Sequence, residues 1–414
     1  MAASMSEQNK NEIELVRNFD LNSIDKEFIT NPFPTCRALR NHSPLHQNAD
    51  GSLFLTRYDD VMTAYRHPAM SSDKKVAFKE KFGESPLYTH HTTSLIFNDP
   101  PYHTVVRKLL SSGFTPRKLR SMEPLIEKIV DGLLDRLSDL RTFDLVSEYA
   151  MALPTEIISF MLGIPEEHRH LLRQYSLNIL GALDPVVSQK ALDAGNTSVS
   201  DFGEMLKDIV DHRRKKTVAS SDGEILMSLI LGEVDGRKLT TQELIQNCIF
   251  LLNAGHETTT RLIGNGMYTL FNHQDQMMHL KNNYDLIPNA IEEMLRYEPP
   301  VHATVRFAES DMIYNEKSYK RGTAFAVSIA GANRDPEANA NPNEFDILRD
   351  NIKHISFGYG PHMCIGASLA RIESRIAFES IFERFSKLEL LDQNPSWGKN
   401  LIFRGFDHLN LKAS

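Results

Sequence analysis

The stretch His354-Ile-Ser-Phe357-Gly358-Tyr359-Gly360-Pro361-His362-Met363-Cys364-Ile365-Gly366 decides the fold of this chain. Two glycines and a proline precede the cysteine, so the backbone turns tightly there and can approach a bound group closely. An apolar pattern at helical spacing follows directly, which places Cys364 at a helix N-terminus. Free backbone N–H groups and the helix dipole favour a thiolate at that position.

Cys364 has four interpretations from this loop alone. It is a buried structural cysteine, a reactive nucleophile or redox thiol, half of a zinc or copper site with His362, or an axial thiolate ligand of haem iron. A nucleophile needs a partner base, and a zinc or copper site needs a second Cys or His cluster, which the sequence does not supply. The rigid loop beside open backbone space suits the haem ligand.

Length and composition exclude several classes of protein. The chain has 414 residues, of which 41% are hydrophobic and 24% are charged, so it is not collagen-like, disordered or a disulfide scaffold. The formal net charge of −8 argues against a general nucleic-acid binder, because neutralising phosphates needs a basic surplus.

Cysteine usage and hydropathy predict a cytoplasmic protein without membrane contact. Cys36, Cys248 and Cys364 are too few and too widely spaced for a disulfide framework, which suits a reducing cytosol. The N-terminus is polar and acidic, unlike a signal or transit peptide. No stretch reaches the roughly 18 apolar residues that a bilayer-spanning helix needs.

The patterns predict one mainly α domain with small sheets, of the α+β class, over residues 1–414, because neither repeats nor linkers divide the chain. Residues Met122–Leu140 show helical periodicity, and Asn48-Ala49-Asp50-Gly51 is typical of a hairpin turn. The alternating residues 401–412 predict a strand. The helix-rich core is expected at about 100–300 and 365–385, with β regions at about 44–58, 301–332 and 386–412.

A long helix is predicted over Thr241–Phe271, and its middle is unusual. The run Asn253-Ala-Gly-His-Glu-Thr-Thr-Thr260 puts Gly and Thr inside a helix, where Gly costs about 1 kcal/mol relative to Ala and Thr competes for backbone carbonyls. One interpretation is two helices joined by a capped break. The other is a local groove or bulge beside a ligand, with an acid and a hydroxyl at its edge.

The cysteine loop resembles the haem-binding loop of the cytochrome P-450 superfamily. The pattern is Phe357-x-x-Gly360-x-x-x-Cys364-x-Gly366, and His362 lies two residues before the cysteine, as in the bacterial form. The resemblance implies a P-450-type fold with haem b as cofactor and Cys364 as the iron ligand.

The middle of the long helix is similar to the superfamily's oxygen-binding motif. It reads Ala254-Gly255-x-Glu257-Thr258 in this sequence. The resemblance implies that Thr258 and Glu257 form the catalytic pair that delivers protons when oxygen is activated.

A Glu–Arg pair precedes the cysteine loop by about 70 residues. Glu293 and Arg296 lie at i and i+3 in the expected helix Asn289–Tyr297, a spacing that usually indicates a surface salt bridge. The resemblance implies instead a buried pair, joined by Arg349, that supports the haem loop.

The segment Asp99–Arg107 carries a cationic helix face. His103 and Arg107 lie at i and i+4, a pattern that is often merely solvated. The resemblance implies that they bind the haem propionates together with Arg306 and His362. The residues expected to contact the cofactor are therefore His103, Arg107, Arg306, His362, Cys364, Phe357, Gly358, Gly366, Ala254 and Gly255.

The resemblance implies a monomeric haem-thiolate monooxygenase that uses O2 to hydroxylate a mid-sized lipophilic substrate. The sequence has no flavin or iron–sulfur segment, so a separate ferredoxin and its reductase are expected to supply electrons. The ferredoxin is predicted to dock on a basic patch of this protein formed by Arg107-Lys108 and Arg117-Lys118-x-Arg120. The expected distal pocket comprises Phe250, Asn253, Ala254, His302, Ala303, Thr304 and Val305, with parts of 70–97 and 175–190.

Three alternative functions remain at this point. The first is a haem-thiolate enzyme that uses peroxide or does not hydroxylate, against which the Glu257–Thr258 pair argues. The second is a zinc or copper protein that uses His362 and Cys364. The third is a helical interaction module without catalysis, which would leave the Gly-rich loop unexplained.

Overall fold

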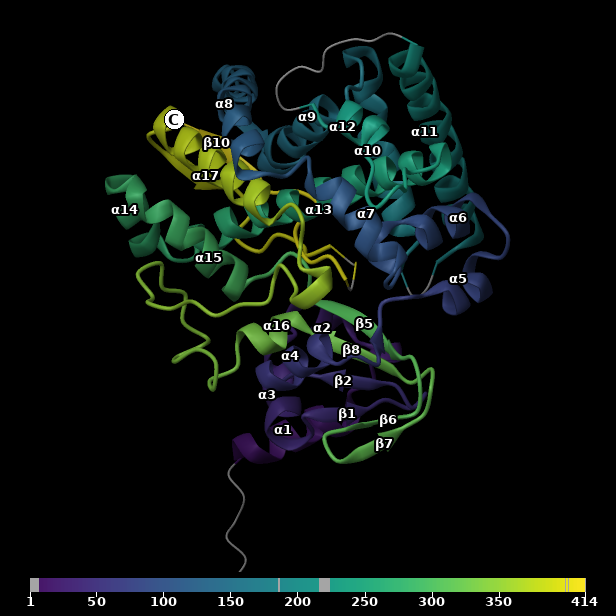
Figure 1. Ribbon diagram of the computed structural model, residues 1–414. Helices are drawn as coiled ribbons and strands as arrows, with labels where there is room; N and C mark the ends of the chain where they lie inside the picture. Colours follow the sequence, from purple (N-terminus) through teal and green to yellow (C-terminus); the bar gives the residue numbers. More distant parts are fainter. Residues whose placement is uncertain (1–6, 185–186, 216–223, 399, 401, 414) are drawn as a thin grey trace, which may run out of the picture.

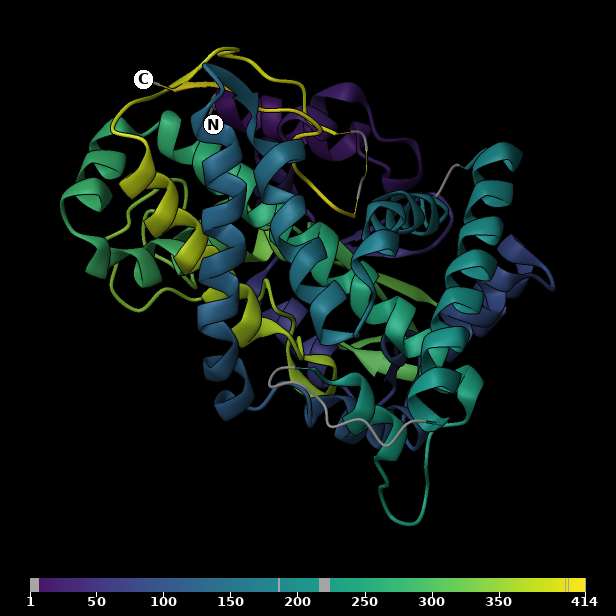
Figure 2. The same ribbon diagram turned by 90° about the horizontal axis from the view of Figure 1, so that it is seen from above.

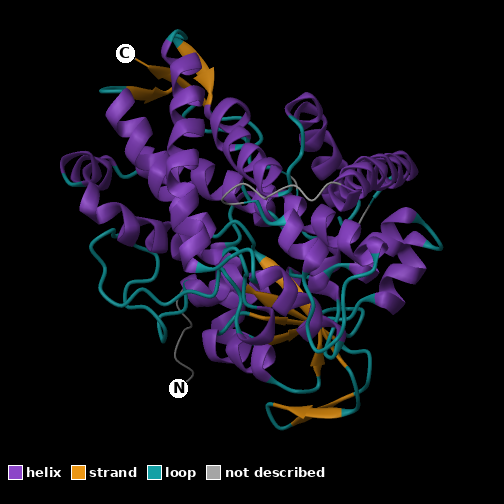
Figure 3. Cartoon of the chain, turned by 45° about the horizontal axis from the view of Figure 1, so that its top comes forward, coloured by secondary structure: helices purple, strands orange, loops and turns teal. Residues whose placement is uncertain are grey.

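The computed structural model describes residues 7–184, 187–215, 224–398, 400 and 402–413, and helices make up most of them (Figures 1 and 3). The predicted fold class, mainly α with small sheets, is confirmed. In the first quarter the helices are α1 (Glu7–Asn18), η1 (Leu21–Ser23), α2 (Lys26–Thr30), α3 (Phe33–His42), α4 (Tyr58–Arg66), α5 (Lys75–Phe82), α6 (Pro86–Thr93) and η2 (Leu95–Phe97).

Most of the remaining helices form the larger, upper part of the molecule in Figure 1, whereas α16 (Ile329–Asn333) lies lower, next to α4. Those before the central helix are α7 (Tyr102–Ser111), α8 (Pro116–Ser138), η3 (Val146–Ala150), α9 (Ala152–Met161), α10 (Glu166–Gly181), α11 (Gln189–Lys215) and α12 (Leu226–Leu231). From the central helix onward they are α13 (Thr241–Phe271), α14 (Gln274–Asn282), η4 (Tyr284–Leu286), α15 (Ile287–Tyr297), α16 (Ile329–Asn333), η5 (Gly360–His362) and α17 (Ala367–Arg384).

Helix α13 is the central helix, and it has the bounds that the sequence predicts. A capping box between Thr240 and Glu243 starts it. Helices α6, α9, α10, α11, α15 and α17 all pack against it, so most of its residues are buried. The helix is continuous through residues 253–260, and the interpretation as two broken helices is wrong.

Helices α8 and α17 lie side by side (Figure 2). Arg375 on α17 reaches Glu123 on α8 at 2.6 Å, and Arg384 reaches Asp135 at 2.5 Å. Because α17 begins directly after the cysteine loop, this packing fixes the loop against the helical core.

The larger sheet has the strand order β1-β2-β8-β5-β3 and lies with α1–α4 in the lower part of Figure 1. The predicted turn at 48–51 is confirmed: Asn48 donates its N–H to the Ser52 carbonyl at 2.8 Å, and Gly51 has φ +84°. The strands are β1 (Leu45–Gln47), β2 (Leu53–Leu55), β3 (Met70–Ser71), β5 (Ala303–Ala308) and β8 (Ala324–Ser328), and β6 (Met312–Tyr314) and β7 (Lys317–Tyr319) form a separate hairpin.

The strand predicted over residues 401–412 is largely wrong. A second sheet pairs β4 (Thr142–Asp144), β10 (Asn410–Ala413) and β9 (Leu388–Leu390), so only the end of the predicted segment is a strand. The residues before it bind α13 instead: Asn265 donates to the Arg404 carbonyl at 2.9 Å. The alternating pattern there reflects packing against a helix, and residue 401 lies outside the described residues.

Within the described ranges, the helices are all too short or too polar to cross a bilayer.

Candidate active site

The cysteine loop is held by its own backbone. Cys364 donates its N–H to the Phe357 carbonyl at 2.8 Å, and Gly358 donates to the Ile355 carbonyl at the same distance. Gly358 and Gly360 have φ values of +68° and +71°, backbone conformations that residues other than glycine rarely adopt. The loop is therefore a rigid platform for the thiol, as the sequence indicates.

The Cys364 thiol is accessible although protein surrounds most of it. Burial raises its pKa, whereas the N–H of Gly366 and the charges of Arg107 and Arg371 act to lower it. The guanidinium of Arg371 also lies 4.5 Å from the centre of the Phe357 ring. A thiol that is reachable and surrounded by positive groups is suited to bind a metal as thiolate.

The four predicted propionate partners converge beside this loop. The rings of His103 on α7 and His362 lie 4.1 Å apart between centroids. Arg107, one turn after His103, donates at 2.6 Å to the carbonyl that precedes the cysteine. Burial, His362, Arg107 and, more weakly, Arg306 on β5 lower the pKa of His103 to about 4.

This cationic cluster has unmet hydrogen-bonding capacity. Both ring nitrogens of His103 are buried without a partner in the described part of the chain. Arg306 donates at 3.2 Å to the carbonyl of adjacent Val305, and its guanidinium lies 5.1 Å from the centre of the Tyr65 ring. An unsatisfied histidine beside the guanidinium groups of Arg107 and Arg306 fits two carboxylates, such as the propionates of haem.

Asp99 orients His362, a contact that the sequence did not reveal. Its Oδ1 lies 3.8 Å from His362 Nε2, and the carboxylate also accepts the Ser71 hydroxyl and, at 3.0 Å, the Ser72 N–H. Partial burial raises the pKa of Asp99, but the hydrogen bonds from His362 and Ser71 outweigh it and hold this pKa well below its usual range.

Helix α13 presents Ala254 and Thr258 on its accessible side. Ala254 is exposed although Asn253 before it is buried, and Thr258 donates its hydroxyl to the Ala254 carbonyl at 2.8 Å. This bond satisfies the threonine hydroxyl within the helix, and α13 continues through this position without the predicted bulge. A Cβ at Gly255 would lie 3.2 Å from Ile158 on α9, so the glycine permits close helix packing.

Glu257 and Thr258 are not joined in the structure. Arg261, one turn later, binds Glu257 Oε1 at 2.7 and 2.8 Å, and Oε2 has no hydrogen-bond partner among the described residues. The same arginine donates to the Phe406 carbonyl at 2.5 Å. The carboxylate is thus turned toward the C-terminal segment, a contact that the local motif did not reveal.

The predicted Glu293–Arg296–Arg349 cluster is confirmed. Glu293 and Arg296 are fully buried and bonded at 2.6 and 2.7 Å, and Arg349 Nε lies 3.3 Å from Glu293. Asn333 extends the support to the haem loop: it donates to Ser356 Oγ at 2.8 Å and accepts the Ile355 N–H at 2.9 Å. Asn333 belongs to no motif that the sequence displays, and it was not among the predicted residues.

His302 does not face the predicted distal pocket. Its Nε2 lies 3.4 Å from Glu298, its ring lies 6.1 Å from that of Phe33, and burial lowers its pKa to about 4. It lines a small space of about 40 Å³ beneath the N-terminal helices. Residue 302 precedes β5 by one position, and its backbone bond to Ile402 turns the side chain toward α3.

Two other predicted distal residues have protein partners. Asn253 is buried, with its Nδ2 3.5 Å from His90 Nε2, and Thr304 Oγ1 lies 3.0 Å from the Tyr65 hydroxyl.

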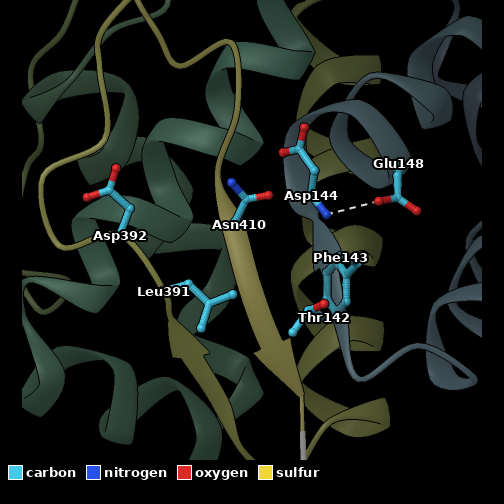
Figure 4. Close-up of a pocket in the computed structure, with 7 residues that line it drawn as sticks. All are labelled: Thr142, Phe143, Asp144, Glu148, Leu391, Asp392 and Asn410. Carbon is cyan, nitrogen blue, oxygen red and sulfur yellow. Dashed lines mark hydrogen bonds between the residues drawn. The ribbon is translucent and has the colours of Figure 1, made fainter.

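A larger, open hollow of about 400 Å³ lies at the second sheet, between β4, β9 and β10 (Figure 4). Glu148 accepts the Asp144 N–H there at 3.0 Å. Its lining residues are Thr142, Phe143, Asp144, Glu148, Leu391, Asp392 and Asn410. They include none of the predicted site residues, so this hollow is separate from the candidate active site.

The residues present fit a haem group. An accessible thiol on a rigid loop supplies an iron ligand. His103, whose ring nitrogens have no partner among the described residues, lies with His362, Arg107 and Arg306, and together they supply sites for two carboxylates. The zinc or copper alternative lacks support, since the described residues contain no group of three or more His, Cys, Asp or Glu side chains arranged to hold a metal ion.

Comparison with known proteins agrees with this geometry. The sequence model described as cytochrome P-450 matches residues 45–400. The chain is 35% identical to cytochrome P-450 monooxygenase PikC of Streptomyces venezuelae, over 95% of this chain and 94% of that protein. It is 36% identical to vitamin D(3) 25-hydroxylase of Pseudonocardia autotrophica, over 88% of each.

Solved structures show the same relationship. P-450 BioI, crystallised with an acyl carrier protein that carries hexadec-9Z-enoic acid, superposes with a TM-score of 0.88 at 30% identity, covering 94% of this chain and 100% of that one. Fold, cysteine loop and sequence therefore agree, and the chain belongs to the cytochrome P-450 family of haem-dependent monooxygenases.

Proposed function

We propose that this protein hydroxylates a mid-sized lipophilic substrate with haem b held by Cys364, and that residues 1–414 act as one catalytic domain. The observation that carries the proposal is the accessible Cys364 thiol on a rigid loop beside the cationic cluster. When bound, haem supplies the oxidant by activating O2 at its iron.

The chain's own residues have three tasks in this reaction. Cys364 holds the iron as thiolate, and His103, Arg107, Arg306 and His362 bind the two propionates. On α13 the exposed Ala254 leaves room next to the cofactor. We assign proton delivery to Thr258 and Glu257, and Arg261 holds the Glu257 carboxylate in place.

A lipophilic substrate is supported by the relatives. One is named for hydroxylating vitamin D(3), and a structural neighbour was crystallised with a fatty acid on its carrier protein. Vitamin D(3) and the fatty acid are both largely apolar molecules.

We also propose a cytoplasmic location. The free, buried cysteines Cys36 and Cys248, whose pKa values burial raises to about 11 and about 12, suit a reducing compartment.

We propose a ferredoxin as electron donor, docking on the face outside the cysteine loop. Tyr359 and Met363 are exposed there by 38% and 47%. Arg66 lies over the Tyr359 ring at 4.6 Å, and Arg117 and Arg120 extend from the start of α8 into solvent. A surface with exposed Tyr359 and Met363 and with arginines around them suits the docking of an acidic protein. Lys118 does not belong to this face, because its ammonium donates to Ser228 Oγ at 3.1 Å.

An absorbance spectrum of the purified protein, reduced under carbon monoxide, tests the proposed function. We expect the strongly red-shifted Soret band of thiolate-ligated haem, and we expect Cys364→Ser to lose it. Cys248→Ala is the matched control, because Cys248 is a free cysteine buried in α13, outside the cysteine loop. A band typical of histidine ligation, or folded protein without haem, contradicts the proposal.

A further inference from the structure

Lys74, located between β3 and α5, is a cation without an anionic partner among the residues that the structure describes. Its ammonium lies 5.0 Å from the centre of the Phe97 ring and 6.0 Å from that of Phe78. The side chain is half-buried. Its only contacts of this kind in the described chain are with these two rings, with neither a carboxylate nor a hydrogen-bond acceptor at the ammonium.

Two carboxylates that contact the chain next to Lys74 are already used. Asp73 binds Lys75 at 2.5 Å, and Asp99 binds Ser71 and Ser72. Burial, followed by the positive charges of Arg306 and Lys81, lowers the pKa of Lys74 to about 8. The local environment therefore contains excess positive charge.

Partly burying the Lys74 ammonium beside other positive charges costs free energy unless an anion binds it. A cation removed from water loses hydration energy, and neighbouring like charges add to this cost. The faces of the two aromatic rings compensate only part of this cost. A carboxylate on the ammonium would relieve both penalties.

The position of Lys74 connects it to the proposed reaction site. Strand β3 pairs with β5 at Ser71 and Phe307, which brings the following residues near Arg306. His91 on α6 packs on the same two rings, at 5.2 Å from Phe78 and 5.6 Å from Phe97.

His90, the neighbour of His91 on α6, contacts two residues of α13. The ring of His90 lies 4.9 Å from that of His91 and bonds to Gln246 at 3.0 Å. His90 also approaches Asn253, the residue before the exposed Ala254, at 3.5 Å. Phenylalanine and histidine rings thus extend from the ammonium toward α13.

We propose that Lys74 binds a carboxylate inside this protein, and that a lipophilic substrate with a carboxylate end supplies it. The inference rests on the proposed function, since it names the substrate class of the same site. A haem propionate has the same chemistry, because Arg306 lies close by. The experiment therefore has one arm for each source.

The substrate arm compares dodecanoic acid with dodecan-1-ol, which have the same chain but differ in charge. Each is titrated into the haem-loaded enzyme and followed by the spin-state shift of the Soret band. We expect Lys74→Met to weaken binding of the acid at least tenfold and to leave binding of the alcohol within twofold. Lys74→Arg should restore binding of the acid. Lys79→Met is the control and should change neither affinity, because Lys79 on α5 already pairs with Glu84, just after that helix.

The haem arm measures the rate at which each variant loses haem to apomyoglobin. A several-fold faster loss from Lys74→Met than from Lys79→Met, with unchanged acid binding, assigns the carboxylate to a propionate. If both arms give wild-type values, or if acid and alcohol weaken equally without haem loss, the proposal is wrong. The carbon monoxide spectrum of each variant reports separately on the proposed function.

Discussion

Glu373 on α17 is a buried acid that the proposed chemistry does not use. It is 3% exposed, its Oε2 has no hydrogen-bond partner in the described ranges, and burial raises its pKa to about 8. The unfolded chain releases this proton near pH 4.5, whereas the folded protein keeps it up to about pH 8. Glu373 therefore lowers the free energy of unfolding progressively between these two pH values.

At the residue scale we expect Glu373→Gln to remove this pH dependence. The free energy of unfolding should rise at pH 8 by on the order of a few kcal/mol and change little at pH 4.5, measured by urea denaturation. Glu383→Gln, at an exposed position near the end of α17, is the control and should have little effect. An equal change at both pH values would show that packing rather than ionisation controls this site.

At the element scale, α15 holds the long connection to the cysteine loop through Glu293 and Arg296. Removing one partner leaves the other charge buried, which costs roughly 3–5 kcal/mol. We expect Glu293→Ala to lose this much free energy of unfolding and to lose haem readily, because Arg349 and the backbone N–H of Asp346 also bind Glu293.

The matched control for α15 is an exposed ion pair on α11. Asp211 lies 2.9 Å from Lys207 at i and i+4, and both side chains are exposed. Asp211→Asn should cost less than about 0.5 kcal/mol. Similar losses in the two variants, measured by urea unfolding and by haem content, would contradict the structural role of the buried cluster.

At the scale of the whole molecule, the net charge is −8, but Arg117 and Arg120 form a local basic face. We expect Arg117→Glu with Arg120→Glu to slow reduction by a ferredoxin about tenfold at low salt, because steering depends on charge, and the difference should shrink at high salt. Stopped-flow reduction under carbon monoxide measures this rate.

The control for docking changes the same charge elsewhere. Lys317 and Arg321 are exposed at the β6–β7 hairpin, at the lower edge of Figure 1. Replacing both by Glu should leave the rate nearly unchanged. If both pairs slow reduction equally, net charge rather than a docking face controls the encounter.

Sequence alone predicted the elements whose cause is local. The bounds of α13 follow from its capping box and apolar periodicity, and the turn at 48–51 follows from its glycine. The cysteine loop was predictable because its glycines, its hydrogen bonds and the following helix lie within a few residues of one another. The buried pair Glu293–Arg296 was predictable from the family motif rather than from its charge pattern.

The tertiary structure alone decided which partner each side chain meets. Arg261 meets Phe406 from 145 residues away, which turns Glu257 toward the C-terminal segment, and the contact of His302 with Phe33 depends on how α3 packs. Lys74 has no motif, and its unpaired charge is visible only beside Arg306. Local patterns fix backbone conformation, whereas side-chain environment depends on distant segments brought together by burial of the core.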